Sequence, residues 1–186
     1  MRLPDADPDE SPELAAAFAE FRRTRGIVSN VMKSFAHAPR GLAAIVALGG
    51  YCRYQTELSG RQREMVILIT GRGVDYAWDH HAPLGLKAGL SEAELGAIRA
   101  GQVPQGLPDH DQALAEYVFA YAALAGVPAP VFDRLRAHFS PRQITDINII
   151  SGYYLMIAAS IIGMEVTLDP ASVRDAETRF HAARHG

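Results

Sequence analysis

The stretch SGRQREMVILITG, residues 59–71, decides the fold of this chain. Ser59 followed three residues later by Gln62 is a capping-box pattern, which predicts the start of a helix. The apolar run 65–69 comes soon after it and lacks the alternation of apolar and polar residues that marks a half-buried strand. The stretch therefore predicts an apolar helix that begins at Ser59.

The same pattern of helix starts returns along the chain, and no strand pattern accompanies it. Ser91 with Glu94 and Ser140 with Gln143 are further capping boxes, and Ser11 is followed by a proline at the first helical position. Proline and glycine boundaries predict the remaining helices, at residues 12–25, 28–36, 39–58, 109–125 and 130–139, and a loop at 101–108. We expect an all-α protein of about nine helices.

Length, charge and cysteine content exclude several classes of protein. The 186 residues are 48% hydrophobic and 21% charged, as in folded globular proteins. We expect one domain over residues 1–186, with a flexible N-terminus at 1–10 and a polar tail at 171–186. The net charge of -3 argues against nucleic-acid binding, which needs an excess of basic residues. The single cysteine, Cys52, excludes a disulfide framework, a cysteine-based zinc site and a CxxC redox pair.

The sequence also bears on location in the cell. The acidic N-terminus does not resemble a signal peptide. Residues 147–164 carry no charge, and their length touches the threshold for a membrane span. Asn148, Ser151 and Ser160 interrupt this stretch, and no basic cluster sets an orientation. We therefore expect a core or subunit-contact helix, no membrane association and a cytoplasmic protein.

Two segments of the chain indicate a diverged internal duplication. The capping boxes at Ser59 and Ser140 lie 81 residues apart, and an apolar run follows each of them. Thr70-Gly71 and Ser151-Gly152 then recur at the same offset. Capping boxes also recur by chance in helical proteins, but the matched hydroxyl-glycine pair favours duplication. The polar residues that could carry chemistry follow only the first segment.

Residues 75–81, DYAWDHH, form the densest polar and aromatic cluster in the chain. On a helix, the pairs four residues apart share a face, so Tyr76 lies beside His80 and Asp75 lies beside Asp79. A histidine near an acid can act as a general acid or base. We interpret His80 as a surface residue and Trp78 as a core anchor.

Glu64 has two interpretations from sequence. Burying its carboxylate beside the apolar run 65–69 is costly unless the carboxylate is paired. Alternatively, it lies in the first turn, where it faces water and the positive end of the helix dipole. The sequence slightly favours the water-facing position.

Residues 39–101 resemble the carboxymuconolactone decarboxylase family, which includes AhpD-like alkylhydroperoxidases. The resemblance rests on the Arg63-Glu64 pair before the apolar run, on the motif Tyr76-x-Trp78-x-x-His81, and on the AGLS motif at 88–91. It implies an AhpD-like helical fold and a homo-oligomer, a trimer or a hexamer. The motif that ends in His81 is most similar to a cysteine-less Tyr-Glu-Trp branch of the family.

Three departures from the family pattern concern the chemistry. The redox branch has two cysteines where this chain has Val74 and Ala77, so thiol-based peroxide reduction is the least favoured function. The Tyr-Glu-Trp branch has a glutamate at Ala77, for which Asp75 or Asp79 would have to substitute. The segment from Arg72 to Tyr76 is also about two residues shorter than the family pattern.

The resemblance implies a cofactor-free lyase that removes CO2 from a small unsaturated or cyclic carboxylate or lactone. His81 would be the general acid or base, Glu64 would set its tautomer and raise its pKa, and Tyr76 would donate to an enolate oxygen. The substrate-binding candidates are Trp78, Asp75, His80 and Arg72, with Arg61 as a further arginine that could hold a carboxylate.

Other readings of these residues stay open or are disfavoured. The missing acid at Ala77 favours an alternative function, a non-catalytic ligand-binding or accessory protein on the same fold. Adjacent residues on a helix diverge by about 100°, so His80 and His81 cannot easily grip one metal ion. No metal or other cofactor is predicted.

Overall fold

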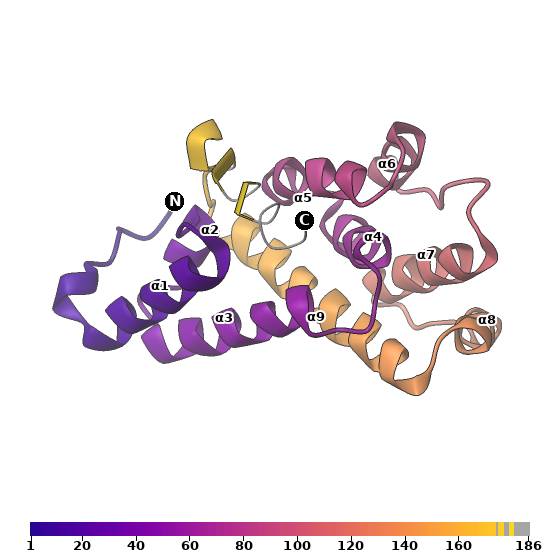
Figure 1. The fold of residues 1–186 in the computed structure, drawn as a ribbon, viewed down its shortest axis with the longest axis horizontal. Helices are drawn as coiled ribbons and strands as arrows, with labels where there is room; N and C mark the ends of the chain where they lie inside the picture. The colour runs from indigo at the N-terminus through magenta and orange to yellow at the C-terminus, as the bar shows by residue number, and fades with distance from the viewer. Residues whose placement is uncertain (174, 177–178, 181–186) are drawn as a thin grey trace. The chain divides into compact units, whose positions relative to one another are not determined.

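The computed structural model describes residues 1–173, 175–176 and 179–180, and the remainder of the predicted polar tail lies outside the described residues. In the described residues the chain is all-α, as the sequence predicted, with no strand. The elements, shown in Figure 1, are η1 (Pro8–Glu10), α1 (Pro12–Arg25), α2 (Asn30–Lys33), α3 (Pro39–Tyr54), α4 (Gly60–Gly71), α5 (Asp75–Lys87), α6 (Glu92–Arg99), α7 (Asp109–Ala122), α8 (Ala129–His138) and α9 (Pro141–Gly163).

The chain forms two compact units. Unit 1 comprises Met1–Tyr51 and Ala159–Gly186, and unit 2 comprises Cys52–Ala158. In unit 1, the hydroxyl of Ser11 caps α1 by accepting a hydrogen bond from the Leu14 amide. A positive φ of 84° at Gly26 ends this helix, a conformation that glycine adopts without steric cost.

Helix α4 is the centre of unit 2 and contacts α5, α6 and α7 (Figure 1). Every residue from 64 to 71 is buried, so the apolar run forms part of the core on all sides. The predicted capping box is confirmed, because the Ser59 hydroxyl accepts from the Gln62 amide and the Gln62 side chain accepts from the Ser59 amide. These bonds satisfy amide groups that the first turn leaves without helical partners.

The AGLS motif ends α5 and begins α6. Gly89 has a φ of 97°, which reverses the chain at low cost because glycine has no side chain. The Leu90 amide then donates to the Gly85 carbonyl at 2.9 Å, and the Leu90 side chain is buried. Ser91 follows as the capping residue of α6 and forms a capping box with Glu94.

Some helices are shorter than the sequence predicted. The short helix expected at 28–36 spans only Asn30–Lys33, the one expected to reach residue 58 ends at Tyr54, and α7 ends at Ala122 rather than 125. The ends at residues 54 and 122 are C-terminal ends, which capping boxes do not mark, so the local sequence specifies these boundaries less sharply than the helix starts.

Helix α9 is the one described helix that is long and apolar enough to cross a membrane by length and composition alone. Core helices of soluble proteins pass the same test. Within unit 2, α9 buries the Asp146 carboxylate, which accepts from the Glu57 amide at 2.9 Å. Asn148 accepts from the Tyr117 hydroxyl at 2.9 Å. These polar groups are bonded to protein, as buried polar groups in a core must be.

The two segments related by the 81-residue offset have matching roles in unit 2. Ser140 forms a capping box with Gln143, like that of Ser59 in α4. Thr70 and Ser151 are both buried. A Cβ added to Gly71 would lie 3.0 Å from Ala77 Cβ, and one added to Gly152 would lie 3.4 Å from the Tyr121 hydroxyl. Gly71 therefore permits close packing, whereas a Cβ at Gly152 would make an ordinary van der Waals contact.

Candidate active site

Helices α4 and α5 bring Glu64 and His81 together. The His81 Nδ1 atom lies 2.9 Å from Oε2 of Glu64. The turn between the helices contains only residues 72–74, but Gly71 has no side chain, so Ala77 packs closely against it. His81 lies one helical turn beyond Ala77 on the same face, and this close approach allows the contact despite the shortened segment.

Glu64 is buried rather than exposed to water, so the position that the sequence slightly favoured is wrong. Its side chain is 4% exposed, and the equally buried Arg53 approaches with Nη1 3.6 Å from Oε1. Burial by itself would raise the pKa of Glu64, but the charges of Arg53 and His81, the hydrogen bond from His81 and the charge of Arg63 outweigh it. Together they lower the pKa to about 2. Glu64 is therefore an ionised carboxylate inside the core of unit 2.

The ionised carboxylate assigns the tautomer of His81. A carboxylate only accepts hydrogen bonds, so Nδ1 of His81 carries the proton in this contact. In the neutral imidazole, Nε2 is then the nitrogen that accepts a proton, and in the charged form it donates one. The side chain is 13% exposed, and its ring meets Tyr154 edge-on with 5.2 Å between the centroids. The geometry is that of a positioned acid-base pair.

Tyr76 and His80 lie next to each other on α5. Tyr76 is buried, and its ring stacks on that of His80 with 4.7 Å between the centroids and 18° between the planes. The pair follows the four-residue spacing expected on a helix. Their stacked rings lie on the turn of α5 that precedes His81.

Trp78, Asp75 and Arg72 form a separate cluster around Arg99 of α6. The guanidinium of Arg99 lies over the Trp78 ring at 5.0 Å, forms an ion pair with the exposed Asp75 and donates to the Arg72 carbonyl. The Arg72 side chain donates to the Ile69 carbonyl at 2.8 Å and lies over the Phe119 ring. The contacts of these three residues hold the turn between α4 and α5.

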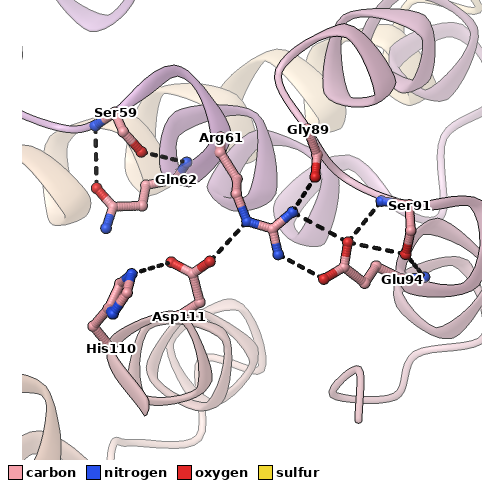
Figure 2. A network of polar contacts seen from close by, with 8 residues as sticks. All are labelled: Ser59, Arg61, Gln62, Gly89, Ser91, Glu94, His110 and Asp111. Atoms are coloured by element: carbon pink, nitrogen blue, oxygen red, sulfur yellow. Dashed lines mark hydrogen bonds and ion pairs between the residues drawn. The ribbon is translucent and has the colours of Figure 1, made fainter. Parts of the chain in front are cut away.

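Arg61 is engaged in a network that joins α4 to α6 and α7 (Figure 2). Its Nε donates to the buried Asp111 at 2.8 Å, and its Nη2 lies 2.5 Å from Oε1 of Glu94. Its Nη1 donates to the Gly89 carbonyl at the end of α5. The hydrogen bond that Arg61 donates to Glu94 outweighs burial, and together with Asp111 it raises the pKa of Arg61. Arg61 thus ties three elements together.

Sequence reasoning missed three residues near the dyad, namely Arg53, Arg63 and Tyr154. Arg63 adjoins Glu64, and its charge could have been weighed with the Arg-Glu pair. Arg53 and Tyr154 come from α3 and α9, at the two ends of unit 2 in sequence. No spacing in the chain indicates that these two side chains meet α4 and α5.

Metal ligation finds no support in the described part of the chain. No group of three or more histidine, cysteine, aspartate or glutamate side chains lies close enough there to hold an ion. Cys52 is buried and outside the motif that ends in His81.

Comparison with solved structures shows the same fold in proteins of low identity. A variant of the debrominase Bmp8 in complex with 2,3,4-tribromopyrrole has a TM-score of 0.75 at 15% identity, over 96% of this chain and 97% of that chain. An uncharacterized peroxidase-related protein from Silicibacter sp. TM1040 has a TM-score of 0.74 at 21% identity, over 94% and 93%.

A third match is the alkylhydroperoxidase AhpD core of an uncharacterized peroxidase-related protein from Ralstonia eutropha JMP134. Its TM-score is 0.74 at 18% identity, over 93% of this chain and 94% of that chain. No curated protein matches the sequence.

A family model matches about half of the sequence, in the part that contains the Glu64–His81 pair. The model of the carboxymuconolactone decarboxylase family matches residues 39–127, which include α4, α5, α6 and α7. The matched segment contains the capping box of α4, both members of the Glu64–His81 pair and the AGLS turn. With its AhpD-like helical fold, this chain is similar over residues 39–127 to the carboxymuconolactone decarboxylase family.

Proposed function

We propose that this protein is a cofactor-free, decarboxylase-like lyase that acts on a small unsaturated or cyclic carboxylate or lactone. The observation that carries the proposal is the contact between His81 and the buried, ionised Glu64. A general acid or base needs a defined tautomer and a charge that stabilises its protonated form. Glu64 supplies both to His81.

The reaction that fits this pair moves a proton to or from carbon. When CO2 leaves, the electron pair passes into a conjugated carbonyl of the substrate, and an enolate results. His81 then protonates carbon from Nε2, while Glu64 stabilises the imidazolium that exists before transfer. Tyr76 is the proposed donor to the enolate oxygen. A substrate role for His80, Trp78, Asp75 and Arg72 stays a prediction, and the last three are engaged with Arg99 or Phe119.

A second candidate function is non-catalytic ligand binding on the same fold. Ala77 lies where one branch of the family has a glutamate, and a Cβ added to Gly71 would lie 3.0 Å from its side chain. Position 77 therefore serves helix packing and supplies no acid. Thiol-dependent peroxide reduction is the least favoured function, because Val74 and Ala77 occupy the cysteine positions.

His81→Ala separates the first two candidates. A thermal-shift screen of small lactone, keto and aromatic acids identifies ligands, since binding to the native state raises the melting temperature. We expect turnover of a bound acid, measured as CO2 release, to fall about 10²- to 10⁴-fold in His81→Ala, with an unchanged circular dichroism spectrum. His138→Ala, on the exposed face of α8, is the matched control.

Two results would contradict the lyase proposal. Unchanged turnover in His81→Ala would remove His81 from the chemistry. Saturable binding without product in the wild type would favour the non-catalytic alternative.

We further propose a cytoplasmic homo-oligomer, a trimer or hexamer, without nucleic-acid or membrane partners. Met156 and Ile162 of α9 are 39% and 64% exposed in the single chain, and apolar side chains of this size are often covered by subunit contacts. Light scattering that returned the mass of one chain would contradict the assembly.

A further inference from the structure

Arg63 is the basic residue next to Glu64 on α4, and its guanidinium makes no hydrogen bond or ion pair with the described residues. The side chain is half-buried, and its Nε atom is closed off from solvent without a hydrogen-bond partner. Its Nη2 atom lies 3.7 Å from the position of a Cβ added to Gly60. The guanidinium therefore folds back along the first turn of α4, toward the end where Ala88 closes α5.

The surroundings of Arg63 combine burial with one negative and one positive side chain, those of Glu64 and Arg53. Burial lowers the pKa of Arg63, the negative charge of Glu64 raises it, and the positive charge of Arg53 lowers it again. Tyr154 and Tyr54 are the other groups that act on it. The Glu64 carboxylate already accepts a hydrogen bond from His81 and forms an ion pair with Arg53. An unsatisfied charged donor in such a place is costly, and an anion that accepts its hydrogen bonds removes the cost.

Other arginines of unit 2 near α4 are already used by the protein. Arg61 donates to Asp111, Glu94 and Gly89, and Arg99 pairs with Asp75. Arg72 donates to a carbonyl and lies over Phe119. Arg63 differs because no described residue accepts a hydrogen bond from its planar set of donors, which matches the two oxygens of a carboxylate.

We infer that Arg63 is the anion-binding, specificity-determining residue of the site, and that it selects ligands with a planar carboxylate over neutral ligands of the same shape. The inference rests on the proposed function for its location beside the acid-base pair. Arg63 adjoins Glu64 on α4, and Glu64 accepts a hydrogen bond from His81. A carboxylate bound to Arg63 therefore lies near the acid-base pair. Pairing stabilises the charge of a ground-state carboxylate, so Arg63 holds a carboxylate that the reaction retains.

The test compares each acid with its own amide, because the two differ in charge and little in shape. Benzoate with benzamide, and the carboxylate of an unsaturated γ-lactone with its amide, are titrated calorimetrically into the full-length protein. We expect the wild type to prefer both acids. Arg63→Gln should weaken binding of the acids about 10- to 100-fold, the range for hydrogen bonds to a charged group, and leave the amides unchanged.

Two further variants sharpen the result. Arg63→Lys keeps the charge but loses the planar fork, so its affinity for the acids should fall between those of the wild type and Arg63→Gln. Arg136→Gln removes an equal charge from an exposed side chain of α8 and should bind like the wild type. Circular dichroism and melting temperature show whether each variant is folded.

Two outcomes would overturn the inference: a wild type that binds neither acid better than its amide, and an Arg63→Gln variant that keeps the preference for the acids. In the second case, loss of the preference in Arg72→Gln would assign the carboxylate to Arg72 instead. The proposed function fails separately. If His81→Ala leaves turnover unchanged while Arg63→Gln loses the acids, the anion site stands without the lyase chemistry. If His81→Ala abolishes turnover while Arg63→Gln keeps the preference, the lyase chemistry stands without this site.

Discussion

Arg61 and Arg63 lie two residues apart at the start of α4, and the protein uses them differently. Arg61 donates to two carboxylates and a carbonyl, and with them it connects α4 to α6 and α7 (Figure 2). The side chain of Arg63 donates to none of the described residues, although its Nε is buried. Residues two apart on a helix leave it in directions about 200° apart, so the side chains of Arg61 and Arg63 start from different faces of α4.

The difference separates structure from function on one helix. The side of α4 that carries Arg61 meets carboxylates of this same chain, so its charges are balanced once the chain folds. The side that carries Arg63 adjoins Glu64 and Arg53, and the Nε donor of Arg63 is buried there without a partner among the described residues. Charged groups that a fold leaves unsatisfied are more informative about binding than those it pairs.

Arg61→Ala should have the largest effect on stability. Asp111 is 2% exposed, and without Arg61 its carboxylate loses its main charged partner inside the core. Breaking a buried pair in this way costs about 3–5 kcal/mol of unfolding free energy, which urea unfolding followed by circular dichroism measures. The double variant Arg61→Ala with Asp111→Ala should recover part of that loss. A loss below about 1 kcal/mol in the single variant would show that the network is not structural.

Acid should reveal the charge of Glu64. Its pKa in the folded protein is about 2, against an ordinary value of 4.5, so the folded state binds the proton more weakly than the unfolded state. The stabilisation is complete above the ordinary value and is lost as the pH falls from about 4.5 to about 2, a total of about 3 kcal/mol. Unfolding free energies measured between pH 4.5 and pH 2 give the slope of stability against pH.

Glu64→Gln is the control for that slope, because the amide does not titrate. The variant should be less stable than the wild type at neutral pH, and its stability should fall less steeply in acid. A slope equal to that of the wild type would show that Glu64 is not the group responsible.

Arg63→Met should have the smallest effect on stability. No hydrogen bond or ion pair to the described residues is lost, and a buried charge is removed, so we expect a change within about 1 kcal/mol in either direction. The same denaturation experiment measures it beside Arg61→Ala. A loss as large as that of Arg61→Ala would mean that Arg63 stabilises the fold as much as Arg61 does.

Local chemistry explains why much of the fold could be predicted. The capping boxes at Ser59, Ser91 and Ser140 involve residues three apart, so their hydrogen bonds need only the local chain. The same holds for the positive φ of Gly89 in the AGLS turn. The C-terminal ends of α3 and α7, at residues 54 and 122, depend on packing and were misplaced.

The candidate site was predictable only in part, for the same reason. The motif and the spacing on α5 directed attention to His81, and the adjacent Arg-Glu pair directed it to Glu64. Because the turn between α4 and α5 is shorter than in the family pattern, the sequence did not show whether Glu64 and His81 come into contact. The close packing of Ala77 against Gly71 allowed the contact, and packing of two helices cannot be read from either one alone.

By itself, the sequence determined the helices, their caps and the residues with chemical potential, because these depend on neighbours within a few positions. Only the tertiary structure decided which of those residues meet. It buried Glu64 against His81 and Arg53, and it engaged Arg61, Arg72 and Arg99 with the protein. Partners distant in the chain become neighbours through packing, so the distinction between a paired arginine and one left for a ligand exists only in the folded protein.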